Sequence, residues 1–357
     1  MRYVLTKHLS TGDKLGSDLI LSQNRVLLRR GRVLTRTMIN KLEVLGFQGL
    51  YVDDKLSEGI VVSDVISQEL KSTAINEIET LFFNGENNRH DSVKKQMPQL
   101  KNIIHNIVDE VVSNRDIMVN IIDIRDFDDY TYSHSLNVAV LSVVMGTVLG
   151  LGKRTLYELA MGALLHDTGK MFVDKQILNK PARLTPEEFD EIKNHSERGY
   201  KYLCDQLEIP ENAKKVALQH HEQYNGNGYP LGLSKNDIHL FGRIACVADV
   251  YDALTSDRPY RKGMLPSDAI EYIMSGYNTM FDPNVVEALA KKIAPYPVGT
   301  CVLLSSGDTG IVVENYESAS LRPKIKLIVD GEPTDNYIHL ATDMSALSIT
   351  IKEIIQC

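Results

Sequence analysis

The sequence predicts a mainly α protein, in which a helical bundle lies between a small N-terminal α+β module and a small C-terminal antiparallel β element. From about residue 96 to 294, apolar residues recur at three- and four-residue spacing, as on one face of a helix. Before residue 60 and after Pro297, short β-branched runs alternate with turn residues, which is typical of strands. We therefore expect an α+β module at 1–62, a helical linker at 63–114, the main helical domain at 115–295 and a β-rich extension at 296–357.

The N-terminal module reads as four strands and one helix. The runs YVLT, DLILS, RVLL and GLYV are bounded by turn signals, whereas TRTMINKLEVLG has helical spacing. A further helical pattern covers 62–83. The polar stretch NGENNRHDS at 84–92 is the best candidate for a flexible break before the next helices.

The main domain contains at least five amphipathic segments. They are LKNIIHNIVDEVVSN, SHSLNVAVLSVVMGTVLG, KRTLYELAMGALLHD, PEEFDEIKNHSERGYKYL and DAIEYIMSGYNTMFD. Thr185 before Pro186 predicts a helix start, with the threonine as N-cap and the proline in the first helical position. After Pro297, the runs TCVLLS, GIVVEN, KIKLIVD and DNYIHL predict an antiparallel sheet, and SITIKEII fits either a short helix or a strand.

Composition narrows the class of protein. A chain of 357 residues with 43% apolar residues can bury sizeable cores and suggests two or three domains. The formal charge of −8 argues against a partner that is a DNA or RNA polymer, although a local cluster of cations could still bind a phosphate ligand. No apolar run approaches the roughly 20 residues of a membrane span, and the start has no signal-peptide pattern. The four cysteines are scattered, which indicates free thiols, and we expect a cytoplasmic protein.

Histidine and aspartate residues beside apolar stretches are the main candidates for chemistry. They come from five helical segments: His134, His166, Asp167, His195, His220, His221 and Asp249. A buried polar or charged group is costly unless it is partnered, and neutral imidazole with carboxylate suits divalent transition metals. Helical bundles build metal sites by projecting such residues inward from facing helices. Taken alone, an HD pair followed by Thr-Gly is more typical of an ordinary helix end than of a metal site.

Two adjacent histidines raise a geometric question. On a helix, the side chains of His220 and His221 would point about 100° apart. Either the stretch HHEQYNGNGYP is a polar helix end with an ordinary turn behind it, or both imidazoles converge on something outside the helix.

The order of these motifs resembles the HD-GYP branch of the HD metal-dependent phosphohydrolases. The motifs that carry the resemblance are HSLNVAVLS, HDTGK, HSERG, HHEQYNGNGYP and ADVYDALTSDRPYRK, over roughly residues 115–295. The resemblance implies an HD-type helical domain that hydrolyses the bacterial second messenger cyclic di-GMP. The product would be pGpG, with further cleavage to GMP left open.

The resemblance also implies two divalent transition-metal ions. One would be held by His134, His166, Asp167 and Asp249, and the other by Asp167, His195, His220 and His221. Asp167 would then bridge the ions, and consecutive histidines could serve one ion where the helix gives way to a loop. Two ions neutralise phosphate oxygens and activate a water to hydroxide. The family suggests iron or manganese, and the donor set also admits nickel or zinc.

One position departs from the family pattern. Some members hold a third ion through a Glu four residues before the first histidine. Tyr130 stands at that position here, and Asp129 would be a geometrically shifted substitute. The resemblance therefore implies a two-metal centre.

Further residues would contact the substrate or the transition state. We assign Lys170 to phosphate charge stabilisation or leaving-group assistance. In the family the glycine-rich loop shapes the pocket, which implicates Gly228, Tyr229 and Pro230. Arg258 and Arg261 form a cation pair suited to phosphate oxygens. They could instead pair with Asp252 or Asp257 and stabilise the loop, or do both, since a salt bridge can orient a binding arginine.

Other readings stay open at this point. The substrate could be another cyclic dinucleotide such as cyclic GMP-AMP, or the protein could be a receptor or scaffold that binds without turnover. The N-terminal module could mediate regulation or formation of a homodimer. Glu222 could orient a histidine or face solvent.

Overall fold

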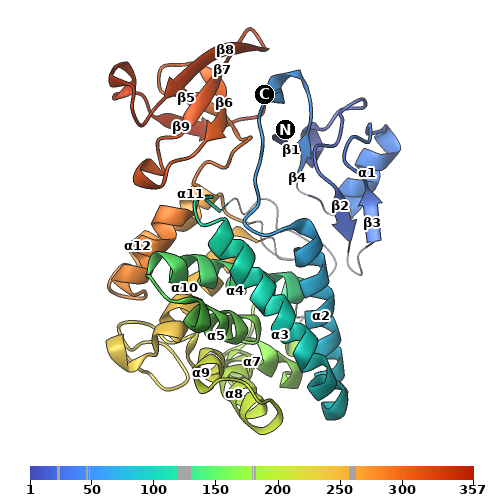
Figure 1. The fold of residues 1–357 in the computed structure, drawn as a ribbon, viewed down its shortest axis with the longest axis vertical. Coiled ribbons are helices and arrows are strands. Elements are labelled where there is room, and N and C mark those ends of the chain that lie inside the picture. Colours follow the sequence, from blue (N-terminus) through green and yellow to red (C-terminus); the bar gives the residue numbers. More distant parts are fainter. Residues whose placement is uncertain are drawn as a thin grey trace. The chain divides into compact units, whose positions relative to one another are not determined.

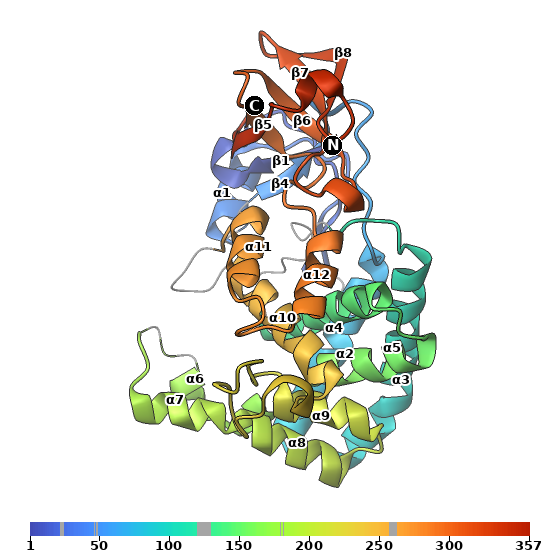
Figure 2. The same cartoon turned by 90° about the vertical axis from the view of Figure 1, so that its left-hand side faces the viewer.

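The computed structural model describes residues 1–21, 25–45, 47, 49–119, 130–178, 180, 182–256 and 263–357. The described residues divide into two compact units (Figures 1 and 2). A helical unit contains residues 65–116 and 130–290. A β-containing unit combines residues 1–64, 117–119 and 291–357.

The helices predicted for the middle of the chain are present. They are α2 (Gln68–Glu86), α3 (His90–Ser113), α4 (Tyr130–Val148), α5 (Lys153–Leu164), α6 (Lys175–Leu178), α7 (Pro186–Lys193), α8 (His195–Gln206), α9 (Glu211–Gln219), α10 (Leu240–Thr255), α11 (Pro266–Ser275) and α12 (Pro283–Lys292). The predicted start of α7 is confirmed, because the Thr185 hydroxyl accepts a hydrogen bond from the Glu188 amide and Pro186 begins the helix.

Helix α4 forms the centre of the helical unit. Every residue from Ser133 to Gly146 is buried, and the helix contacts α2, α3, α5 and α10. A helix that is apolar on all sides has to lie inside the fold. Because α4 also carries His134, that imidazole is held in the interior of the unit.

The predicted break at 84–92 is mostly wrong. Helix α2 continues to Glu86 and α3 begins at His90, so only residues 87–89 separate the two helices. Phe82 and Val93 are buried on either side of this turn. Packing of these apolar side chains keeps the polar residues around them helical, which local composition did not show.

The strands of both ends follow the predicted runs. In the N-terminal part, β1 (Arg2–Leu5) pairs with β4 (Gly49–Val52), β2 (Leu19–Leu21) pairs with β3 (Arg25–Leu28), and α1 is Arg36–Val44. The C-terminal strands are β5 (Cys301–Leu304), β6 (Thr309–Glu314), β7 (Lys324–Val329), β8 (Glu332–His339) and β9 (Ile351–Ile354). They form an antiparallel sheet in the order β8-β7-β6-β5-β9, so the segment that fitted a helix or a strand is a strand.

The two ends of the chain pack together in one unit. The Tyr3 amide donates to the Gly299 carbonyl oxygen at 3.0 Å, and the Lys326 amine donates to the Glu58 carbonyl oxygen at 3.2 Å. Ile60 is buried in one apolar cluster with Ile311 and Ile328 of the C-terminal sheet. Burial of these side chains joins segments separated by more than two hundred residues of sequence.

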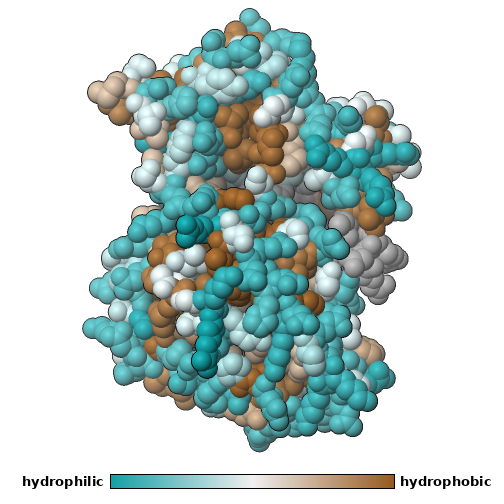
Figure 3. All heavy atoms as spheres, viewed as in Figure 1, coloured by the Kyte–Doolittle hydropathy of each residue, from teal (hydrophilic) through white to brown (hydrophobic). Residues whose placement is uncertain are grey.

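Polar side chains cover most of the surface shown in Figure 3, and the apolar side chains on it form separate patches. Among the described residues, no helix has the length and apolar character needed to cross a bilayer. All four cysteines are free: Cys246 and Cys301 are buried, whereas Cys204 and Cys357 are exposed.

Candidate metal centre

The seven predicted ligands lie together in the helical unit. His134 lies on α4, His166 and Asp167 follow α5, His195 begins α8, His220 and His221 follow α9, and Asp249 lies on α10. Most of these side chains are fully buried, and the most accessible are His221 and Asp249, at 24% and 13%. Five segments that are distant in sequence therefore converge on one small, nearly closed region.

The ligand atoms form two groups. One consists of His134, His166 and Asp167, and the other of His195, His220 and His221; within each group the donor atoms lie within 4.8 Å of one another. Asp249 is close to both, since its Oδ1 lies 3.1 Å from His134 Nε2 and its Oδ2 lies 3.8 Å from His221 Nδ1.

Asp167, a member of the first group, also faces the second. Its Oδ2 is 3.3 Å from His166 Nε2 and 3.7 Å from His134 Nε2. Its Oδ1 is 3.4 Å from His195 Nε2 and 3.9 Å from His220 Nε2. One carboxylate oxygen thus faces each group, as a bridging ligand requires.

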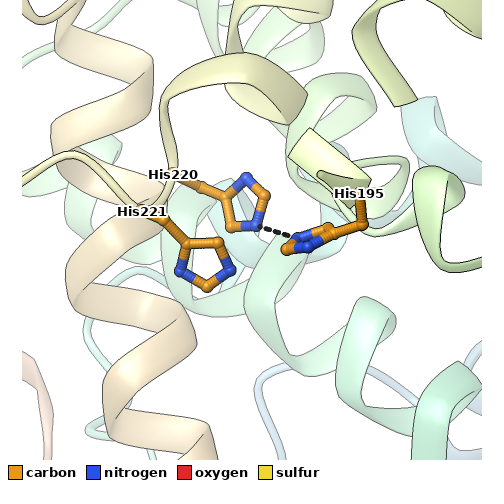
Figure 4. Close-up of side chains that lie close together, drawn as sticks. All are labelled: His195, His220 and His221. Carbon is orange, nitrogen blue, oxygen red and sulfur yellow. Dashed lines mark hydrogen bonds between the residues drawn. The ribbon is translucent and has the colours of Figure 1, made fainter. Parts of the chain in front are cut away.

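The end of α9 answers the question of the adjacent histidines. The helix stops at Gln219, and His220 is its C-cap. From there the His220 and His221 rings turn toward the same region as His195, as Figure 4 shows. The ring centroids of His195 lie 5.3 Å from His220 and 5.0 Å from His221. His220 and His221 can both reach this region because the helix ends at Gln219, immediately before them.

Backbone carbonyls orient three of the histidines. The Nδ1 atoms of His166, His195 and His220 lie 2.7, 2.6 and 3.0 Å from the carbonyl oxygens of Ala163, Ile192 and Val216, respectively. A carbonyl only accepts hydrogen bonds, so each Nδ1 carries the proton and each Nε2 presents a lone pair to the centre. Metal-binding histidines are typically fixed in this way.

Lone pairs without a hydrogen-bond donor indicate that this region fits a cation. With both Nδ1 protons committed, the Nε2 lone pairs of His195 and His220 face each other at 3.2 Å (Figure 4). Among the described residues, buried His166 Nε2 and Asp167 Oδ1 have no hydrogen-bond partner. Unpaired buried acceptors of this kind are costly, and divalent transition metals at the two groups would satisfy these atoms.

The protonation states suit metal ligands. Burial lowers the pKa of His195, of His220 and of His221, the last to about 3, so these imidazoles are neutral. Burial opposes ionisation of Asp167 and Asp249. His166 and Lys170 outweigh it at Asp167, His134 outweighs it at Asp249, and the pKa of each carboxyl is held well below its usual value.

His134 behaves differently from the other histidines. Burial lowers its pKa, but hydrogen bonds to Asp249 and Asp252 outweigh this and raise its pKa to about 9. Without an ion the imidazole therefore carries a proton, which a metal ion would displace, since metal binding at histidine releases protons.

Asp252, which the sequence suggested only as a partner for Arg258 or Arg261, is a residue of the centre. Its Oδ2 lies 2.7 Å from His134 Nδ1, and its Oδ1 accepts a hydrogen bond from the Asn137 amide at 2.7 Å. Asp252 is fully buried one helical turn beyond Asp249 on α10. This spacing places both carboxylates on one face of the helix and could have indicated the role.

The glycines of two motifs bring the ligands together. A Cβ on Gly169 would lie 1.8 Å from the His195 carbonyl oxygen, and a Cβ on Gly199 would lie 2.9 Å from the Gly169 nitrogen. The 3-10 helix η4 (Thr168–Phe172) can therefore pack directly against α8 only because both residues lack a side chain. This contact brings Asp167 within reach of His195.

Those predicted substrate residues that the structure describes lie beside the centre. The Lys170 amine pairs with Asp167 Oδ2. The Tyr229 ring stacks on the His221 ring at 4.7 Å between centroids, and a cis peptide joins Tyr229 to Pro230. A Cβ on Gly228 would lie 2.2 Å from the Gln223 nitrogen. Arg258 and Arg261 lie outside the described residues, as do Asp128, Asp129 and the side chain of Tyr130.

Glu222 does neither of the things considered for it. It is 1% exposed, and its carboxylate accepts hydrogen bonds from the Leu231 amide at 2.7 Å and the Leu233 amide at 3.0 Å. Burial raises the pKa of Glu222, although its backbone hydrogen bonds act in the opposite direction. The residue binds the loop rather than a histidine or solvent.

Comparison with known proteins identifies the helical domain. The family model described as "HD domain" matches residues 116–285, the region that contains every predicted ligand. These residues are an HD domain. The comparison confirms the resemblance that the motifs indicated.

Curated relatives of the HD domain carry names of two kinds. Cyclic di-GMP phosphodiesterase PA4108 of Pseudomonas aeruginosa is 38% identical over 225 residues, which are 63% of this chain and 54% of that protein. The 3'3'-cGAMP-specific phosphodiesterase 3 of Vibrio cholerae is 34% identical over 168 residues, which are 47% of this chain and 36% of that protein. The chain thus spans about half or less of the length of these relatives.

A solved structure shares the fold. Bd1817, described as an HDG"Y"P protein from Bdellovibrio bacteriovorus, matches with a TM-score of 0.54 over 80% of this chain and 97% of its own. The sequences are 19% identical. The predicted fold class, mainly helical with small β-containing ends, is therefore confirmed.

Proposed function

We propose that this protein is a metal-dependent phosphodiesterase that hydrolyses cyclic di-GMP to pGpG. The observation that carries the proposal is the position of Asp167, whose two carboxylate oxygens face two separate groups of histidines. An HD domain with 38% identity to a protein named cyclic di-GMP phosphodiesterase supports the choice of substrate. Whether cleavage continues to GMP stays open.

Two ions would use the two groups of ligands. His134, His166, Asp167 and Asp249 would hold one ion, and Asp167, His195, His220 and His221 would hold the other. When bound, two such ions neutralise phosphate charge and lower the pKa of water so that it can attack phosphorus. We propose iron or manganese, because the resemblance to the HD-GYP branch implies these metals, while the donors also admit nickel or zinc.

The other side chains of the site act on the substrate directly. Lys170 places a cation beside the bridging carboxylate, where it can stabilise charge that develops on a phosphate oxygen or on the leaving group. Tyr229 and Pro230, held close to His221 by Gly228, would form one wall of the pocket. Arg258 and Arg261 would bind phosphate oxygens.

The relatives also support a second candidate substrate. A protein named for 3'3'-cGAMP is 34% identical over nearly half of this chain, so cyclic GMP-AMP is the alternative. The remaining candidate, a receptor or scaffold without turnover, is disfavoured because all seven ligands and Lys170 are brought together.

Several broader features belong to the same proposal. A substrate that is an internal second messenger would place the protein in the cytoplasm. We retain segment boundaries at 1–62, 63–114, 115–295 and 296–357, and a homodimer formed through the N-terminal module. Size measurement by light scattering would test the last of these.

The proposal predicts turnover by the metal-loaded protein. Protein purified without oxygen and loaded with ferrous or manganous ions is incubated with cyclic di-GMP or cyclic GMP-AMP, and the products are separated by chromatography. We expect pGpG to form faster than the product of cyclic GMP-AMP. Faster cleavage of cyclic GMP-AMP would support the alternative substrate. If neither nucleotide yields product, the remaining candidate is a receptor or scaffold without turnover.

A further inference from the structure

We infer that Glu222 is a positioning residue, whose buried carboxylate holds the loop at 226–233 in place and so sets where Tyr229 and Pro230 meet the substrate. The inference rests on the proposed function for its substrate. The anchoring itself can be measured without turnover.

The carboxylate of Glu222 is committed to the backbone of the loop. It is 1% exposed and, among the described residues, pairs with no lysine or arginine. Each of its oxygens accepts one backbone hydrogen bond, Oε1 from Leu231 and Oε2 from Leu233. Because a buried carboxylate is costly unless hydrogen-bonded, these amides are what makes its burial tolerable, and the carboxylate in turn fixes them.

This end of the loop is held by the Glu222 hydrogen bonds and by its base, where the Lys235 amide donates to the Tyr224 carbonyl oxygen at 2.9 Å and Asn225 pairs with Ser234. The Leu231 side chain is 52% exposed, so burial of apolar surface contributes little to its position. Between Pro230 and the base of the loop, the attachment therefore runs through the Glu222 hydrogen bonds. Removing them would free the backbone on the C-terminal side of Pro230.

The other end of the loop is attached to the metal ligands. The Tyr229 amide donates to the His221 carbonyl oxygen at 3.2 Å, and the two rings stack. Gly228 packs directly against the backbone of Glu222, since a Cβ on Gly228 would be 2.5 Å from Glu222 Cα. Tyr229 and Pro230 are thus held from both sides, by His221 and by Glu222, next to the region where the ions would bind.

Replacing Glu222 tests this arrangement. Glu222→Gln keeps the size of the side chain and one acceptor oxygen, whereas Glu222→Ala removes both acceptors. In manganese-loaded protein we expect amide hydrogen exchange in 226–233 to accelerate in the order wild type, Gln, Ala, with metal content unchanged. KM for cyclic di-GMP should rise about tenfold or more in the Ala variant, with a smaller effect on kcat.

Glu208→Gln is the matched control, because Glu208 is an exposed glutamate of the same unit. It should match wild type in exchange, metal content and KM. Unchanged exchange in Glu222→Ala would overturn the inference, as would faster exchange with unchanged KM, or loss of metal from both variants. If wild type itself shows no turnover, the proposed function fails, while the exchange measurement still decides whether Glu222 anchors the loop.

Discussion

At the scale of single residues, the centre depends on what holds each imidazole as much as on the imidazole itself. Three histidines are oriented by carbonyls within their own segment, three or four residues away. His134 depends on Asp252, which lies 118 residues away in sequence. Motif spacing predicts the ligands, but no local pattern shows a partner this distant. Glu222 stayed unassigned for another reason, because its partners are backbone amides of a loop, which no side-chain motif marks.

The role of Asp252 predicts a specific loss of metal. In Asp252→Asn, His134 loses its anionic partner and its fixed orientation, so metal affinity should fall by about 10- to 100-fold. Titration of metal-free protein with manganese, followed by calorimetry, measures the change. Asp205→Asn, at an exposed position on α8, is the control and should leave the affinity unchanged. Equal affinities in wild type and Asp252→Asn would show that the contact does not orient His134.

At the scale of elements, most helices and strands could be predicted because their apolar residues follow a clear period. The boundaries that could not be predicted were set by packing, as at the turn between α2 and α3. The contact between η4 and α8 is also a packing feature that could not be predicted from the sequence. The glycines of HDTGK and HSERG are visible in the sequence, but only the structure shows that Gly169 and Gly199 touch.

This contact predicts that a single methyl group disrupts the site. In Gly169→Ala the added carbon would collide with the backbone at His195, which cannot yield as a flexible side chain can. We expect a loss of about 3 kcal/mol or more in the free energy of unfolding, and a weaker second metal site.

Thermal and denaturant unfolding of metal-free protein measure this loss. Gly152→Ala, whose Cβ would meet nothing within 4 Å, should cost less than about 1 kcal/mol. If the two variants were equally stable, packing of η4 on α8 would not be what positions Asp167.

At the scale of the whole molecule, the two units differ in how much of each could be predicted from the sequence. The helical unit is nearly continuous in the chain and carries all seven predicted ligands of the centre. The β-containing unit is assembled from both ends. Local patterns predicted its strands, but its joint core depends on side chains such as Ile60 and Ile311, whose pairing no periodicity reveals.

The central claim is that Asp167 bridges two ions that hydrolyse a cyclic dinucleotide. The most direct test measures metal content and pGpG formation together, in wild type and in Asp167→Ala. We predict close to two ions per chain and steady product formation in wild type, and loss of both in the variant. An Asp167→Ala protein that lacks bound metal and still forms pGpG would contradict the account.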